Sequence, residues 1–240
     1  MVSKMNRIVI DCEATQINPA KQCDAKSALV YDVGWLVENT TTGDILAKRS
    51  YVVADIFYGR PDLMATAYYS DKIPAYNGGI QSGEWAVKSF REIWDQFKRD
   101  CKNFDVSKVW AYNCSYDYHA LNHTIKVLSN GFCNYFIPYG VEMCDIWQAT
   151  TVITGTKKYV RWCYENGYTT DSGNPQTSAE IVYRYISDDN TFDEDHTALS
   201  DALIELQILK RIDKRKQKKS KKWGNGWQKA SKVAESMGLK

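Results

Sequence analysis

Two acidic residues two positions apart follow an apolar run near the start of the chain, in the segment RIVIDCEAT. They are Asp11 and Glu13, with Cys12 between them. Because side chains alternate between the two faces of a β-strand, we expect both carboxylates on one face and the thiol on the other. Neighbouring carboxylates repel each other, and a divalent cation relieves that repulsion. The pair therefore predicts a metal site, with two solvated acids at a strand end as the simpler alternative.

A second polar group lies in the segment NCSYD, where the predicted strand 109–112 meets a helix. Asn113 and Asp117 could act purely in capping, because amide and acidic side chains stabilise helix N-termini. Their position also suits ligand binding, since ligands of α/β sheets bind where strands end and helices begin. The sequence leaves both interpretations open.

The third group, HTALSD, opens the last long helix. On one regular helix His196 and Asp201 would differ in direction by about 140°. They can therefore share a site only if His196 lies in the entering loop or in an irregular first turn. A neutral imidazole near a metal-bound water is suited to accept a proton at pH 7, and Asp201 could complete the metal shell. A surface histidine near a helix start is the alternative.

The elements that must position these groups are those of a mixed α/β sheet. A turn at residues 41–44 joins two strands. Thr177 and Glu180 form a capping box that predicts a short helix, whereas the polar residues 157–175 indicate a loop or insertion. Strands are predicted at 7–12, 28–38, 45–54, 109–112 and 141–146, and longer helices at 84–101, 117–129 and 199–215.

The composition is that of one soluble globular domain, or of one domain plus an appendage: 240 residues, 44% hydrophobic and 25% charged. The sequence lacks an apolar run of about 18 residues that could span a membrane, and acidic residues follow the N-terminus too soon for a secretory signal. We therefore expect a cytoplasmic protein that binds no membrane. The seven cysteines include no CxxC pair and are expected to be reduced thiols.

Positive charge is concentrated at the C-terminal end. From Lys210 onward there are 12 Lys and Arg against two acids, whereas the preceding residues contain 19 bases and 27 acids. This asymmetry predicts contact with a polyanion, with a solvated lysine-rich helix end as the alternative. Trp223 and Trp227 could stack on bases, pack in the core or bind a partner. The expected nucleic-acid contacts are Lys214, Arg215, Lys216, Lys218, Lys219, Lys221 and Lys222.

In this order, the patterns DxE, NxxxD and HxxxxD resemble the three motifs of the DEDDh exonucleases, the superfamily of the polymerase proofreading subunit and RNase T. The resemblance covers about residues 7–212, and residues 174–205 also look like exonucleases encoded by bacteriophages and bacteria. It implies an RNase H-like mixed five-stranded sheet flanked by helices on both faces. The expected division is an exonuclease domain at 1–212 and a basic tail at 213–240.

The resemblance also implies the activity, a two-metal 3′–5′ exonuclease that uses Mg²⁺ or Mn²⁺. Asp11, Glu13, Asp117 and Asp201 would be the metal carboxylates, and His196 the general base. The expected substrate is nucleic acid with a free 3′ end, with single-stranded DNA preferred over the alternative of RNA. A protein partner or self-association through the tail is a further expectation.

Ala14, Thr15 and Asn113 are the expected contacts to the terminal nucleotide. Many relatives have Thr-Thr-Gly where this chain has Ala14-Thr15, so the substrate preference does not transfer.

Two alternatives use other chemistry. A zinc site of Cys114, His119 and His123 lacks a fourth ligand at usable spacing. A non-catalytic nucleic-acid-binding or assembly module could keep the fold, but all five catalytic positions are filled.

Overall fold

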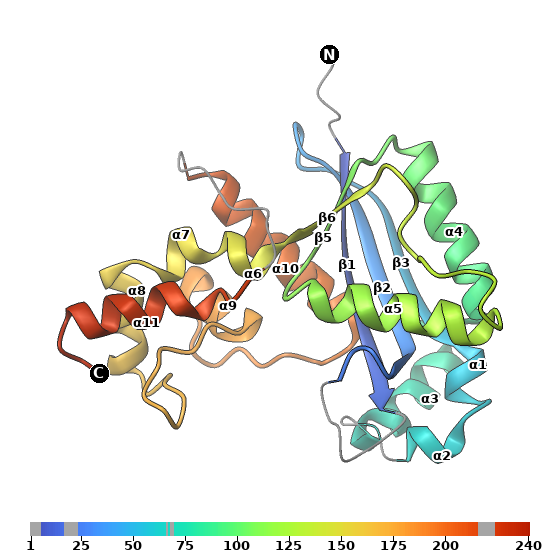
Figure 1. The fold of residues 1–240 in the computed structure, drawn as a ribbon, viewed down its shortest axis with the longest axis horizontal. Coiled ribbons are helices and arrows are strands. Elements are labelled where there is room, and N and C mark those ends of the chain that lie inside the picture. Colours follow the sequence, from blue (N-terminus) through green and yellow to red (C-terminus); the bar gives the residue numbers. More distant parts are fainter. Residues whose placement is uncertain (1–5, 17–23, 66, 68–69, 216–223) are drawn as a thin grey trace. The chain divides into compact units, whose positions relative to one another are not determined.

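Six strands form one sheet within the part of the chain that the computed structural model describes (Figure 1). The structure describes residues 6–16, 24–65, 67, 70–215 and 224–240. The strands are β1 (Asn6–Gln16), β2 (Ala28–Asn39), β3 (Ile45–Val53), β4 (Ala86–Lys88), β5 (Lys108–Ala111) and β6 (Glu142–Asp145). The helices are α1 (Ala54–Phe57), α2 (Pro61–Met64), the 3-10 helix η2 (Ser70–Lys72), α3 (Ile73–Ser82), α4 (Phe90–Asn103), α5 (Ser115–Leu128), α6 (Ile146–Ala149), α7 (Thr151–Thr154), α8 (Lys157–Glu165), α9 (Ala179–Ser187), α10 (Ala198–Asp213) and α11 (Trp227–Ser236).

The strands follow the order β4-β3-β2-β1-β5-β6. β1, β2 and β3 form an antiparallel meander, whereas β5 pairs in parallel with β1, and β4 in parallel with β3. The predicted mixed α/β sheet is therefore confirmed.

The prediction of five strands was wrong, because β4 adds a sixth in the described chain. This strand lies inside residues 84–101, which were predicted as one helix, and three residues are too few to show strand alternation. The helix itself, α4, begins only at Phe90. Its start is fixed by a capping box in which Ser89 and Glu92 each bind the other's backbone N–H through their side chains.

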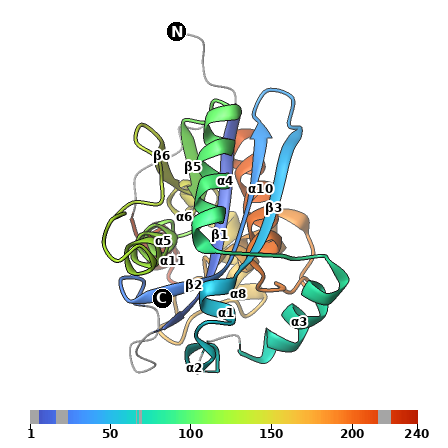
Figure 2. The same ribbon diagram turned by 90° about the vertical axis from the view of Figure 1, so that its right-hand side faces the viewer.

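Helices cover both faces of the sheet, as predicted. Gly34 and Trp35 are neighbours on β2, so they face opposite sides. On the side of Trp35, the indole donates a hydrogen bond to Asp100 of α4 at 3.1 Å and packs edge-on against Phe97, with ring centroids 5.4 Å apart. Figure 2 shows α4 running across this face. On the side of Gly34, the first turn of α10 lies close to the backbone of β2, within 2.6 Å of where a Cβ would be.

The described chain separates into two compact units. Unit 1 consists of Met1–Trp110, Ser115–Met143 and His196–Ala202; unit 2 consists of Ala111–Cys114, Cys144–Asp195 and Leu203–Lys240. The boundary predicted after residue 212 falls one residue before the end of α10. In the regions described, no helix is both long and apolar enough to cross a bilayer.

Unit 2 contains two helices that alter the sequence interpretation. Residues 157–175 were predicted as a loop, but their first half forms α8, whose first turn is capped by the Thr156 side chain. The polar residues of this segment lie on one side of a helix that buries Tyr159, Val160 and Cys163. At the C-terminal end, α11 packs on α8 through Ala230 and Ala234.

Candidate active site

β1 presents the two acidic residues of the DxE pattern opposite β2. In the antiparallel register Asp11 pairs with Gly34 and Glu13 with Asp32. Both acidic side chains are partly exposed, whereas Cys12 between them is buried. This is the alternation that the sequence predicted.

Helix α10 brings a third carboxylate to the first two. Asp201 lies in its first turn. One carboxylate oxygen from each of Asp11, Glu13 and Asp201 lies within 4.8 Å of the other two. Oxygens that coordinate one Mg²⁺ at about 2.1 Å are at most about 4.2 Å apart, so small side-chain adjustments would let all three bind one ion. Because every donor is a carboxylate oxygen, the group fits a hard divalent cation.

His196 precedes α10 and has a left-handed backbone, with φ of 51°. The helix begins two residues later, so His196 lies in the irregular entry that the five-residue spacing required. There its Nδ1 is 4.0 Å from Oδ2 of Asp201. Its side chain remains 29% exposed, against 13% for Asp201, which leaves the imidazole accessible to solvent.

Asp117 is attached to the same strand by a hydrogen bond. It lies in the first turn of α5, is 2% exposed, and its Oδ1 accepts the backbone N–H of Cys12 at 3.1 Å. Burial raises the pKa of the Cys12 thiol well above its ordinary value, and the charges of Asp117 and Asp11 raise it further. Negative charge is therefore concentrated around this part of β1. Asp117 contacts β1, but it does not belong to the group of three gathered carboxylates.

Asp32 is a buried residue of the site that the sequence analysis missed. Its carboxylate accepts the Tyr76 hydroxyl at 2.7 Å and the backbone N–H of Ala198 at 2.9 Å. Burial raises the pKa of Asp32 to about 6, although both hydrogen bonds oppose the shift. Asp32 therefore links the start of α10 to β2 and, through Tyr76, to α3. An acid inside the apolar run LVYDVGWLV was the available signal.

The sequence analysis also missed Gly34. Because this residue has no side chain, the first turn of α10 can lie close to the backbone of β2. A Cβ at this position would lie 2.3 Å from the backbone N of Leu199 and 2.6 Å from the carbonyl carbon of Ala198. Only a residue without a side chain lets α10 approach β2 this closely. Since Gly34 pairs with Asp11, the close approach occurs beside the first carboxylate of the site.

The residues expected to contact substrate occupy different surroundings. Ala14 is partly exposed and follows an irregularity in the β1–β2 register. Thr15 is fully buried, and its hydroxyl donates to the carbonyl of Leu63 at 2.9 Å, which holds α2 against β1. Asn113 belongs to unit 2 and has a left-handed backbone, with φ of 54°. Their substrate contacts remain predictions.

The predicted nucleic-acid tail is described only in part. Lys214 and Arg215 follow α10 closely, and Arg215 donates to the carbonyl of Val152 at 3.0 Å. Trp227 begins α11. The remaining residues of the predicted tail site, Lys216, Lys218, Lys219, Lys221, Lys222 and Trp223, lie outside the described residues.

The described part of the chain offers no support for the zinc alternative. None of its groups of candidate metal ligands includes Cys114, His119 or His123. The six cysteines among the described residues are not paired in disulfides.

Comparison with known proteins gives matches in structure but not in sequence. No family model matches the chain, and no curated protein matches it. The nuclease domain of 3′hExo, a DEDDh family member bound to rAMP, superimposes with a TM-score of 0.52 and 15% identity over 91% of this chain and 99% of that one. A full-length 3′-exonuclease gives 0.58 and 14% over 93% and 89%. E. coli Exonuclease I in complex with a dA16 oligonucleotide gives 0.53 and 10% over 88% and 41%.

This chain has the fold of the DEDDh exonucleases. The RNase H-like fold predicted from the three motifs is thus confirmed, and the motif residues Asp11, Glu13, His196 and Asp201 come together in unit 1 of that fold.

Proposed function

We propose that the chain is a metal-dependent 3′–5′ exonuclease, a hydrolase that removes nucleotides from the 3′ end of nucleic acid. The observation that carries the proposal is the convergence of Asp11, Glu13 and Asp201 next to His196. This convergence occurs in a fold shared with 3′-exonucleases. Three gathered carboxylates alone would suit many metal sites, whereas the added histidine supplies a proton acceptor for hydrolysis.

Each residue has a separate role in this proposal. Asp11, Glu13 and Asp201 hold the metal, and Asp117 contributes a fourth carboxylate, directly or through water. Two Mg²⁺ or Mn²⁺ ions, when bound, would lower the pKa of the attacking water and stabilise charge on the phosphate and the leaving 3′ oxygen. His196, whose Nδ1 lies 4.0 Å from Oδ2 of Asp201, accepts the proton of that water.

Single-stranded DNA is the proposed substrate, with Ala14, Thr15 and Asn113 near its terminal nucleotide. Exonuclease I, which has the same fold, forms a complex with an oligonucleotide of deoxyadenosine. RNA is the second candidate, because another structure with this fold is a 3′-exonuclease that recognises the 3′ end of histone mRNA stem-loop. A cytoplasmic location, and a protein partner or self-association through the tail, also belong to the proposal.

Digestion of 5′-labelled substrates tests the proposal. Single-stranded DNA, duplex DNA and RNA of one sequence are incubated with Mg²⁺, with Mn²⁺ or with EDTA. We expect a ladder that shortens from the 3′ end, depends on metal and is strongest on single-stranded DNA. Asp201→Asn is the matched control, because it removes one charge and keeps the shape of the side chain.

The control must separate catalysis from folding. Asp201→Asn should abolish the ladder, and without metal its melting temperature should stay level or rise, because a repulsive charge has been removed. A ladder that persists in Asp201→Asn would refute the site assignment. Binding of every substrate without any cleavage would favour the non-catalytic module.

A further inference from the structure

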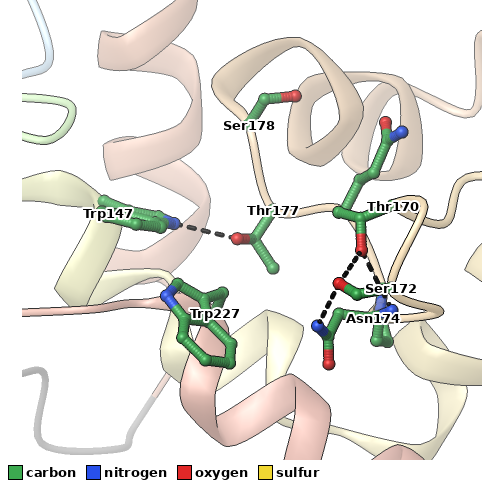
Figure 3. A pocket seen from close by; sticks show the side chains of 9 residues that line it. Trp147, Thr170, Ser172, Asn174, Thr177, Ser178 and Trp227 are labelled. Atoms are coloured by element: carbon green, nitrogen blue, oxygen red, sulfur yellow. Dashed lines mark hydrogen bonds between the residues drawn. The ribbon is translucent and has the colours of Figure 1, made fainter. Parts of the chain in front are cut away.

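A second candidate site lies in unit 2, where none of the carboxylates of the active site takes part. A cavity of about 500 Å³ is lined by Trp147, Trp227 and residues of the polar loop 170–178. Figure 3 shows how these side chains lie. Trp147 comes from α6, and Trp227 is the first residue of α11. The volume falls in the range of ordinary small-ligand sites.

The two tryptophans form an aromatic wall. The Trp147 indole N–H donates to the Thr177 hydroxyl at 2.9 Å, so this polar edge is used within the protein, and the residue lines the cavity. Gly226 lies against Trp147, since a Cβ there would be 2.6 Å from Cδ1 of that indole. This close approach brings Trp227 into the same cavity, where it remains 38% exposed. The wall therefore suits a flat, aromatic ligand.

The opposite wall is the loop 170–178, and two tyrosine hydroxyls donate hydrogen bonds to its backbone carbonyls. The carbonyl of Thr177 accepts the hydroxyl of Tyr112, and the carbonyl of Gln176 accepts the hydroxyl of Tyr159 at 2.7 Å. Both tyrosine rings belong to unit 2. The loop thus holds its position without a ligand, which lowers the entropic cost of binding one.

The front of this wall carries groups that both donate and accept hydrogen bonds. Thr170 accepts the backbone N–H of Asn174 at 3.1 Å, and the Asn174 amide donates to Ser172 at 3.0 Å. The Lys240 ammonium donates to the carbonyl oxygen of the Asn174 side chain. Hydroxyls and amides can serve either polarity of partner. Such a wall fits a ligand whose edge carries mixed donors and acceptors.

A planar face together with a mixed polar edge describes a nucleobase, and the volume leaves room for its sugar. Residues 214–222 contain seven Lys and Arg, whose positive charge could neutralise phosphates. Trp227 follows this run five residues later, so the charge lies close to the cavity in sequence. An aliphatic peptide side chain would contact the tryptophans but would make no hydrogen bond with the polar wall. We propose that this cavity binds a nucleoside unit, either in an unpaired strand or as a free nucleotide. The inference rests on the nucleic-acid binding in the proposed function and does not require hydrolysis.

Binding in EDTA tests the inference separately from catalysis. Dissociation constants are measured for decathymidylate, for an abasic decamer with the same phosphates and for thymidine 5′-monophosphate. Trp227→Ala should weaken binding of decathymidylate about tenfold and leave the abasic decamer unchanged. Trp227→Phe keeps a ring for stacking and should bind more tightly than Trp227→Ala. Tyr139→Ala, which removes a fully exposed aromatic ring from unit 1, should have no effect.

The outcomes separate this inference from the proposed function. The Trp227→Ala effect should be the same in the Asp201→Asn background, so loss of nuclease activity would leave the result standing. Weaker binding of thymidine 5′-monophosphate in Trp227→Ala would extend the site to free nucleotides. Equally weakened binding of decathymidylate and the abasic decamer would overturn the inference, because Trp227 would then support only charge contacts. Unchanged binding of both decamers would overturn it too.

Discussion

Substitution of Gly34 by alanine tests whether the distance between β2 and α10 determines the activity. The added Cβ would lie 2.3 Å from the backbone N of Leu199. An ordinary contact needs about 3.4 Å, so the first turn of α10 must move by about 1 Å, because two backbones cannot yield as a flexible side chain does. Asp201 is two residues beyond Leu199 and must move with that turn.

We expect Gly34→Ala to lower the catalytic rate more than it lowers the folded fraction of the protein. A displacement of about 1 Å at reacting groups can lower the rate by about 10²-fold. Overpacking of a close contact destabilises a protein by about 1–3 kcal/mol. We therefore expect Gly34→Ala to lower kcat by about two orders of magnitude while most of the protein remains folded.

The assay is kcat on a 5′-labelled oligonucleotide, corrected for the folded fraction measured by circular dichroism. Gly78→Ala is the matched control: the same change in an exposed position of α3, where a Cβ meets nothing within 4 Å. It should keep wild-type kcat and stabilise the helix by about 1 kcal/mol. A near wild-type kcat in Gly34→Ala would refute the reasoning, because the site would then tolerate the displaced helix.

Three further predictions concern other parts of the chain. His196→Ala should lower kcat by about 10² to 10⁴-fold while calorimetry shows nearly unchanged metal affinity, since carboxylates hold the ions; loss of metal binding would make His196 a ligand. Burial raises the pKa of Asp145 from 3.8 to about 6. The protonated carboxyl group therefore makes its full contribution to the free energy of unfolding below pH 4, and this contribution is lost as the pH rises through 6. Relative to Asp145→Asn, the wild-type free energy of unfolding in urea should fall by about 1.4 kcal/mol between pH 5 and pH 8, and a constant difference would contradict this. Replacing Lys218, Lys219, Lys221 and Lys222 by glutamine should reduce the salt dependence of single-strand binding and leave kcat little changed. The expected reduction is about 0.7 log units of affinity per decade of salt for each phosphate that is no longer neutralised. An unchanged salt slope would exclude these lysines from phosphate binding.

The sequence predicted the parts of the site that depend on short, local patterns. Alternation along one strand was enough to place Asp11 and Glu13 on one side and Cys12 on the other. The five-residue spacing from His196 to Asp201 was enough to exclude a regular helix through both. In each case the geometry of a single element decides the result, and the described backbone agrees with it.

Short or strongly charged elements were harder to predict. β4 has three residues, which is below the length at which alternation can be recognised. α8 begins with two lysines and lies between glycines. These residues made the helical spacing of its buried apolar positions hard to recognise in the sequence. The helix after Thr177 was predicted correctly, but its N-cap is Ser178, whose side chain accepts the backbone N–H of Ile181. The Thr177 side chain instead accepts the Trp147 indole N–H.

The residues that determine the position of α10 show what motif spacing cannot express. Asp32 and Gly34 lie two apart on β2, directly opposite Glu13 and Asp11. One accepts the backbone N–H at the start of α10, and the other leaves the space that this start occupies. Neither residue needs to contact a metal or a substrate. Motifs of metal-binding and catalytic residues therefore do not include Asp32 or Gly34. Yet the third carboxylate reaches the other two only if α10 lies at this distance from β2. The spacing DxG on β2 is therefore as much a condition of the site as the spacing DxE on β1.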